Sequence, residues 1–88
     1  MSKLVINQEV LSQHMDSEAI LLDMKSEKYF RLNSVAGRAW KLLERGQSIE
    51  AMTGQLAEEF DVTPEVLSRD LEALFSMLQE HGLLIEEQ

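Results

Sequence analysis

The segment from Glu18 to Asn33, EAILLDMKSEKYFRLN, constrains the fold more than any other part of this chain. Two short apolar runs, Ala19-Ile20-Leu21-Leu22 and Tyr29-Phe30-Arg31-Leu32, flank the polar segment Lys25-Ser26-Glu27-Lys28. Apolar, β-branched and aromatic residues on both sides of a short polar loop are typical of a β-hairpin. An isolated two-stranded hairpin is barely stable in water. The rest of the chain must therefore supply a surface on which the hairpin packs.

The N-terminal segment is expected to add a third strand to this hairpin. Lys3-Leu4-Val5-Ile6-Asn7 has the composition of a strand, whereas residues 8–17 are mostly polar and are interpreted as a connection. If the N-terminal strand pairs with Ala19 to Asp23, then Lys28 to Leu32 is the outer strand of a three-stranded antiparallel sheet, with one edge free.

Three helices are predicted after the hairpin. Asn33 or Ser34 is suited to cap the first helix, which stops at Gly46, where a left-handed residue is inexpensive. The second helix starts at Ser48. Thr63 caps the third, which has Pro64 in its first turn and ends at Gly82. Three- and four-residue spacing gives each helix an apolar stripe: Val35, Ala39, Leu42 and Leu43; Ile49, Met52, Leu56 and Phe60; and Leu67, Leu71, Leu74 and Leu78. The tail Leu83-Leu84-Ile85 is expected to fold back onto the core.

This order of elements predicts an α+β fold that is winged-helix-like, with a three-stranded antiparallel sheet followed by three helices. A chain of 88 residues is expected to form a single domain over 1–88. A domain of this size buries roughly 60–65% of its unfolded surface, which leaves room for one core.

The charge balance argues against polyanionic partners. The chain has 16 acidic and 8 basic residues, a net charge of −8, and its basic residues are scattered singly among acids. DNA and anionic membrane surfaces are therefore expected to be repelled. The N-terminus, MSKLVINQEV, is too short and too polar for a signal peptide or a membrane span, so a cytoplasmic location is expected.

No residue pattern in the chain indicates catalysis. There is no cysteine, and the two histidines, His14 and His81, have no second ligand at helical or hairpin spacing. Acidic runs such as Glu58, Glu59 and Asp61 lack a glycine-centred calcium loop and are interpreted as solvated faces. We therefore expect a protein that is not an enzyme and that needs no cofactor or metal.

A DNA-binding winged-helix regulator is one alternative, because the second and third helices have helix-turn-helix proportions. A recognition helix needs basic or amide side chains in its first turns. Here Arg69 stands among Glu65, Asp70 and Glu72. A nucleic acid partner is therefore not expected.

The order and spacing of several motifs carry a family resemblance: Leu22-Asp23, the aromatic strand into Leu32-Asn33, Trp40 with Leu43, Asp70-Leu71 with Leu74, and Gly82-Leu83-Leu84. From about Leu4 to Leu84 the chain resembles the PqqD-like family, also called RiPP recognition elements. The resemblance implies three antiparallel strands and three helices. It also implies a protein that binds the leader segment of a ribosomally made precursor peptide, which adds as a strand to the free edge and lies against the third helix.

Within that family, Trp40 and the strand from Tyr29 to Asn33 resemble the stand-alone proteins of lasso-peptide systems more than the pyrroloquinoline quinone member. The resemblance implies two partner enzymes, a transglutaminase-like leader protease and an ATP-dependent macrolactam synthetase. A pyrroloquinoline quinone biosynthesis chaperone is the second alternative. The turn departs from the family, because Ser26-Glu27 stands where many relatives have glycine.

The expected binding residues come from the outer strand and the third helix: Lys28, Tyr29, Phe30, Arg31 and Leu32, with Leu67, Asp70, Leu71, Ala73, Leu74 and Met77. A free strand edge is a template for another chain. Among these residues, Tyr29, Arg31, Asp70 and Met77 are the expected direct contacts, because a buried role explains them less well. The remaining apolar positions are also suited to the core, and the sequence leaves open which face of the strand meets the third helix.

Overall fold

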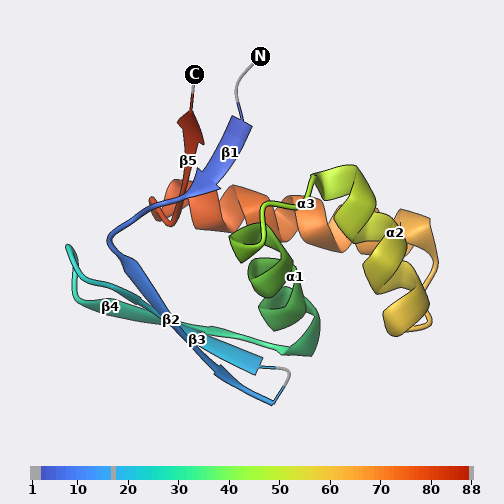
Figure 1. The fold of residues 1–88 in the computed structure, drawn as a ribbon, viewed down its shortest axis with the longest axis horizontal. Helices are drawn as coiled ribbons and strands as arrows, with labels where there is room; N and C mark the ends of the chain where they lie inside the picture. The colour runs from blue at the N-terminus through green and yellow to red at the C-terminus, as the bar shows by residue number, and fades with distance from the viewer. Residues whose placement is uncertain (1–2, 17, 88) are drawn as a thin grey trace.

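The structure of the chain is a computed structural model that describes residues 3–16 and 18–87. Figure 1 shows its elements in chain order: β1 (Lys3–Ile6), β2 (Val10–Met15), β3 (Glu18–Asp23), β4 (Lys28–Leu32), α1 (Ser34–Glu44), α2 (Ile49–Glu59), α3 (Pro64–Glu80) and β5 (Leu84–Glu87). Strands β2, β3 and β4 form an antiparallel sheet in that order, and β1 pairs with β5 in a second antiparallel sheet. The predicted α+β fold, a three-stranded sheet followed by three helices, is confirmed.

The prediction was wrong about which segment forms the first strand of the three-stranded sheet. Residues 10–15, expected to be part of a polar connection, are β2 and pair with β3 from Val10 opposite Asp23 to Met15 opposite Glu18. The N-terminal strand pairs instead with the C-terminal strand, with Ile6 opposite Leu84. This strand was not predicted because its polar residues are typical of a loop. Two of them lie on its inner face, where they hydrogen bond to α1.

The helix boundaries follow the local sequence signals. The side chains of Asn33, Ser48 and Thr63 cap α1, α2 and α3 by accepting hydrogen bonds from amides three residues later, at 2.9, 3.2 and 3.4 Å. Gly46 and Gly82 follow the ends of α1 and α3 with φ of 79° and 75°, a conformation that favours glycine. These two predicted stops are confirmed.

The core lies between the inner face of the three-stranded sheet and the helices. Helix α1 packs on β3, and its Trp40 is buried. The other fully buried apolar side chains come from every layer: Ala19, Leu21 and Leu32 of the sheet; Ala39, Leu42, Met52, Leu56, Leu67, Leu71 and Leu78 of the helices; and Leu83 and Leu84 of the tail. The predicted return of the C-terminal tail to the core is confirmed.

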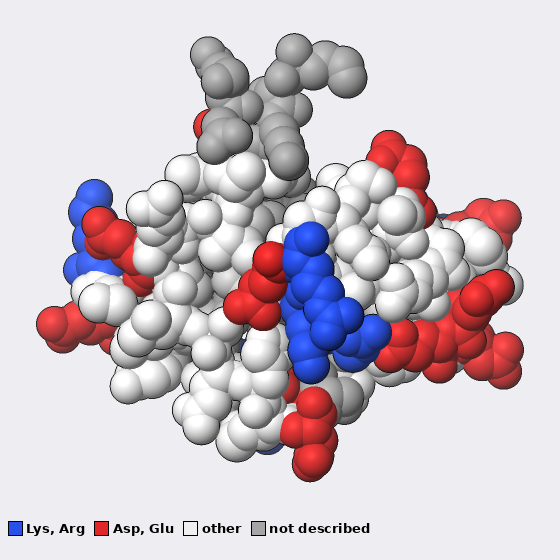
Figure 2. Space-filling model, in the orientation of Figure 1, with Lys and Arg blue, Asp and Glu red and all other residues white. Residues whose placement is uncertain are grey.

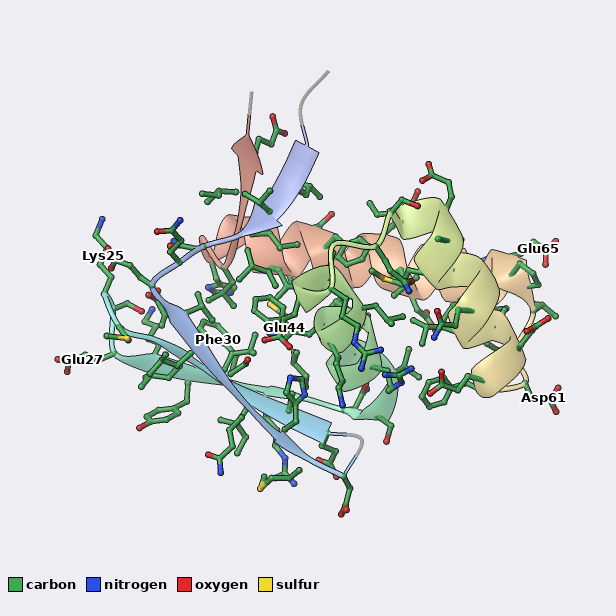
Figure 3. The ribbon with its side chains drawn as sticks, viewed as in Figure 1. Lys25, Glu27, Phe30, Glu44, Asp61 and Glu65 are labelled. Carbon is green, nitrogen blue, oxygen red and sulfur yellow. The ribbon has the colours of Figure 1, made fainter. Side chains whose placement is uncertain are left out.

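Charge is unevenly distributed over the molecule. On the face in Figure 2, acidic side chains gather at the end where α2 meets α3, and Asp61 and Glu65 are labelled at this end in Figure 3. The part of that face below and to the left, over the sheet, carries fewer charges (Figure 2). In the part of the chain that the structure describes, no helix is both long enough and apolar enough to cross a membrane.

Candidate functional site: the free edge of β4 and one face of α3

Strand β4 lies at one end of its sheet. Among the described strands, β3 is its single neighbour, with Leu21 opposite Phe30 and Leu22 opposite Tyr29. The predicted outer strand is therefore confirmed as an edge strand. Its unpaired side can accept another extended chain.

Two hydrogen bonds show which backbone groups of β4 point to this free edge. Met24 directly follows β3, and its amide donates a hydrogen bond to the Glu9 carbonyl at 3.0 Å. The backbone groups of Met24 therefore point toward β2. The Glu27 amide donates to the Asp23 carbonyl at 2.7 Å, so Asp23 faces β4.

Backbone groups alternate in direction along a strand, so Leu21 and Ala19 face β4 as Asp23 does. Their register partners, Phe30 and Leu32, therefore bond to β3. The amides and carbonyls of the intervening residues, Tyr29 and Arg31, point to the free edge.

The side chains of β4 divide between the two faces of the sheet. Leu32 is buried and Phe30 is half-buried on the face that meets the helices. Tyr29 is 70% exposed on the opposite face, where Arg31 Nη2 lies 3.3 Å from Glu18 Oε1. Tyr29 and Arg31 therefore offer backbone groups to the edge but do not line a pocket against α3. Lys28 is exposed at the start of the strand.

The predicted residues of α3 divide in the same way. Leu67 and Leu71 belong to the buried core. Asp70, Ala73, Leu74 and Met77 recur at three- and four-residue spacing, so they lie on one side of the helix. Leu74 and Met77 are half-buried against the core, while Asp70 and Ala73 are exposed.

His81 continues this side of α3, four residues after Met77, and connects it to β4. Its ring centroid lies 5.1 Å from that of Phe30, with the rings tilted by 54°. Figure 3 shows Phe30 on the side of its strand that faces the helices. His81 was not among the predicted binding residues, although its four-residue spacing from Met77 is a signal that the sequence contains. The candidate site is therefore the free edge of β4 together with Phe30, Leu74, Met77 and His81.

The turn before β4 reaches the required geometry without glycine. Glu27 has φ of 62° in the left-handed region. Asp23 stabilises the turn, because its carboxylate accepts hydrogen bonds from the Lys25 amide at 3.1 Å and the Ser26 hydroxyl at 2.8 Å. The bond from Ser26 lowers the pKa of Asp23 below its ordinary value. The departure from the family at Ser26-Glu27 therefore leaves the edge position of β4 in place.

A family model described as "Coenzyme PQQ synthesis protein D (PqqD)" matches residues 18–84, most of the chain. The chain belongs to the PqqD family. The match includes β3, β4 and all three helices, which carry the residues of the candidate site. The predicted family is confirmed.

Two solved structures are similar to this PqqD-family chain over nearly its whole length. One is described as TbiB1 in complex with the TbiA(beta) leader peptide; its TM-score is 0.86 at 34% identity, covering 91% of this chain and 93% of that chain. The other is lasso peptide synthetase B1 complexed with the leader peptide; its TM-score is 0.83 at 28% identity, covering 93% of this chain and 96% of that chain. No protein with a curated description matches. The predicted resemblance to the leader-binding proteins of lasso-peptide systems is confirmed.

A serine, a histidine and a glutamate meet at the other edge of the sheet of this PqqD-family protein. Glu44 Oε2 accepts a hydrogen bond from Ser12 Oγ at 2.6 Å, and Glu44 Oε1 lies 2.9 Å from His14 Nε2. In a nucleophilic triad the histidine stands between the hydroxyl and the carboxylate. Here the carboxylate stands between the other two groups, so the arrangement ties β2 to α1 and does not activate Ser12.

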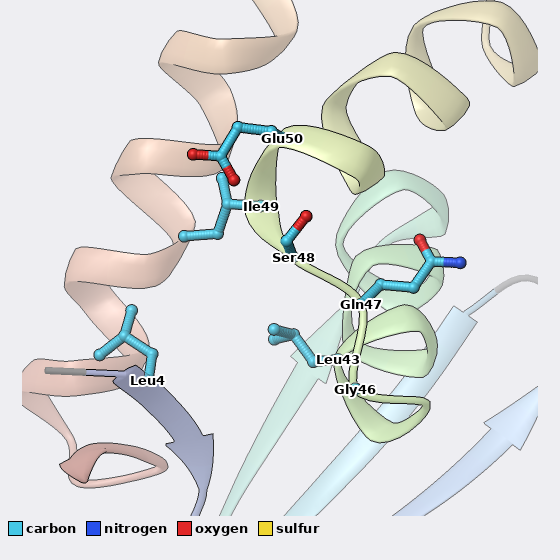
Figure 4. A pocket seen from close by; sticks show the side chains of 7 residues that line it. All are labelled: Leu4, Leu43, Gly46, Gln47, Ser48, Ile49 and Glu50. Carbon is cyan, nitrogen blue, oxygen red and sulfur yellow. The ribbon is translucent and has the colours of Figure 1, made fainter. Parts of the chain in front are cut away.

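A separate cavity of about 430 Å³ lies between β1 and the start of α2 (Figure 4). It is lined by Leu4, Leu43, Gly46, Gln47, Ser48, Ile49 and Glu50. Glu50 is the one ionisable residue of this lining. Over residues 3–16 and 18–87, no three His, Cys, Asp or Glu side chains are grouped so that they could hold a metal ion.

Proposed function

We propose that this protein is a non-catalytic peptide-binding chaperone that recognises the leader segment of a ribosomally synthesised precursor peptide. In this proposal the leader adds as a strand to β4, over residues 28–32, and its side chains lie against α3. The observation that carries the proposal is the outward direction of the Tyr29 and Arg31 backbone groups, on a strand whose Phe30 contacts His81 at the end of α3. The same side of α3 carries the half-buried side chains of Leu74 and Met77. It is supported by the two similar structures, both described as complexes with leader peptides.

The predicted residues take different roles in this proposal. Tyr29 and Arg31 supply about four backbone bonds, each worth a net ~0.5–1.5 kcal/mol, which the ordering of a flexible peptide largely offsets. Selectivity then comes from burial of leader side chains against Phe30, Leu74 and Met77, with space above Ala73. Asp70 is exposed and can accept a hydrogen bond or pair with a basic leader residue. Leu32, Leu67 and Leu71 support this surface from within the core.

The proposal extends to the partners. We propose that residues 1–88 act as one leader-binding domain in the cytoplasm, where precursors are made, and deliver the leader to a transglutaminase-like protease and an ATP-dependent macrolactam synthetase. A pyrroloquinoline quinone chaperone remains the second candidate, because the matching family model carries that description. Both candidate functions would bind a peptide at the free edge of β4, and they differ in the precursor to which that peptide belongs.

Titration calorimetry of the full chain tests the proposal with synthetic leaders of the lasso-type and quinone-type precursors. We expect saturation at one leader peptide per chain, and mass spectrometry should show the bound precursor unchanged. A scrambled leader is the matched control, and low-salt filter binding with duplex DNA tests the regulator alternative. Failure to bind any leader encoded near the gene would contradict the proposal.

A further inference from the structure

The free edge of β4 is regular, and charged side chains are its main protection against pairing with other chains. Its register with β3 is continuous over the whole strand, from Lys28 opposite Asp23 to Leu32 opposite Ala19, so no bulge twists it away. The strand contains no proline. Lys28 and Arg31 are its two charged residues. Such an edge can pair with an extended chain in any register that keeps like charges apart.

The sequence of β4 is complementary to a second copy of itself. In an antiparallel pair of two β4 strands with Phe30 opposite Phe30, Tyr29 of each copy lies opposite Arg31 of the other. The backbone groups of Tyr29 and Arg31 point to the free edge, so both of these pairs are hydrogen bonded, which gives about four bonds. Lys28 then lies opposite Leu32, so no like charges face each other directly.

The neighbouring registers that also match outward backbone groups are less favourable. With Tyr29 opposite Tyr29, Arg31 of each copy lies opposite Glu27, whose amide is already bonded within the turn. With Arg31 opposite Arg31, like charges meet, and Tyr29 lies opposite Asn33, which is the N-cap of α1 and not a strand residue. The register with Phe30 on the two-fold axis is therefore the one that uses the whole edge.

The side chains on both faces of the sheet suit this register. On the outer face of the sheet, away from the helices, the 70% exposed ring of Tyr29 lies beside the guanidinium of Arg31 of the second copy, where a cation–π contact can form. Glu18, 3.3 Å from Arg31, keeps that side chain on the outer face. On the inner face the two Phe30 side chains are direct neighbours, because an opposite pair without hydrogen bonds is the more closely spaced kind.

The distribution of charge permits this contact, although each chain carries a net charge of −8. Acidic side chains gather at the end where α2 meets α3, and Figure 3 shows Asp61 and Glu65 there, well away from Phe30. The molecule is 36 Å long. Charges in water are screened over about 8 Å at physiological salt, so the acidic ends of two copies paired through β4 repel each other weakly.

We propose that two copies of this chain pair through β4 when no leader is bound, in the register with Phe30 on the two-fold axis, and so cover the leader-binding edge. The competition with leader rests on the proposed function. The second copy and the leader need the same amides and carbonyls of Tyr29 and Arg31, so each excludes the other. The apparent affinity for leader therefore falls as the protein concentration rises above the dissociation constant of the dimer.

Single cysteines introduced along β4 report the register, because the chain has no cysteine of its own. Phe30→Cys places two thiols directly opposite each other, at a Cα separation of about 4.5 Å that a disulfide can span. Tyr29→Cys and Arg31→Cys are the matched controls, because each is offset by two residues from its counterpart in the second copy. After mild oxidation we expect about fivefold more covalent dimer from Phe30→Cys than from either control.

A second variant covers the case in which loss of the Phe30 ring unfolds the domain, which circular dichroism would report. Tyr29→Cys and Arg31→Cys combined place a thiol of each copy opposite a thiol of the other, so this variant should also form the covalent dimer. Wild type is measured by sedimentation equilibrium with and without the synthetic lasso-type leader. We expect its mass to rise toward that of a dimer with concentration, and saturating leader to convert it into a complex of one chain with one leader.

Three results would overturn the inference. The first is a wild-type chain that stays monomeric at its highest soluble concentration while it binds leader, which leaves the proposed function intact. The second is equal cross-linking of the three single-cysteine variants, since the contact would then have no fixed register. The third is a dimer that persists when each chain has a leader bound, because the copies would then meet elsewhere. A dimer of a chain that binds no leader would instead overturn the proposed function, and the competition with leader along with it.

Discussion

Met77 and Leu71 lie six residues apart on α3 but belong to different sides of it, so truncating each should affect a different property. Met77→Ala is expected to weaken leader binding by roughly 1–2 kcal/mol, because it removes part of the half-buried surface four residues before His81, whose ring contacts Phe30 of β4. Leu71→Ala should instead lower the free energy of unfolding by about 2–5 kcal/mol, because it leaves a cavity in the core. Calorimetric titration and denaturant unfolding measure the two effects separately. Tyr29→Ala should affect leader binding less than Met77→Ala; the reverse order would place the binding surface on the outer face.

A proline scan of β4 tests the backbone of single residues. Arg31→Pro removes an amide that points to the free edge, so we expect the domain to stay folded while leader binding is lost. Phe30→Pro removes an amide that bonds to β3 and should unfold the domain. Circular dichroism reports the fold, and titration of each folded variant reports binding. Full-strength leader binding by a folded Arg31→Pro variant would argue against strand addition.

At the scale of elements, α1 and α2 are joined by an ion pair that makes stability depend on pH. Arg38 donates to both carboxylate oxygens of Glu59, at 2.7 and 3.1 Å. This hydrogen bond lowers the pKa of Glu59 below its ordinary 4.5 in the folded state. Its stabilisation is therefore complete above pH 4.5 and is lost as the pH falls through the lowered folded-state pKa.

The matched variant for this ion pair is Glu59→Gln, which keeps the shape of the side chain and removes its charge. We expect wild type to melt at a higher temperature than the variant at neutral pH, with a difference that shrinks as the pH falls below 4.5. Comparing the melting temperatures of the two proteins at each pH cancels the contribution of the other carboxylates, such as Asp23. A difference that is constant down to the acid transition would mean that Glu59 is not paired in solution.

At the scale of the whole molecule, the β1–β5 sheet brings the two ends of the described chain together and connects them to the core through Leu83 and Leu84. We therefore expect this sheet to unfold with the rest of the chain. Trp40 is the single tryptophan and is buried in the core, so its fluorescence reports the interior of the fold. Thermal transitions followed by Trp40 fluorescence and by circular dichroism should coincide, and Leu84→Ala should shift both together. Two separated transitions would show that the terminal sheet is an independent unit.

The sequence by itself determined the features whose partners are close along the chain. The hairpin, the caps at Asn33, Ser48 and Thr63, and the stops at Gly46 and Gly82 depend on bonds that span a few residues. These signals therefore predicted the hairpin and the three helices of the α+β fold. The edge position of β4 was predicted correctly although the strand expected on the other side of β3 was the wrong one. The family resemblance rested on the same local motifs in the same order.

The tertiary structure decided the features that depend on distant partners. Ser12 and His14 made β2 resemble a polar connection, because Glu44, which binds them, is 32 and 30 residues away. The face of β4 that meets α3 depends on its register with β3 and on the packing of α1, and neither is encoded within the strand. His81 joined the candidate site only when the fold brought its ring to Phe30, 51 residues earlier in the chain. Which strands pair, and which face of each strand is buried, depends on contacts between segments that are far apart in the sequence. No single segment encodes these features by itself.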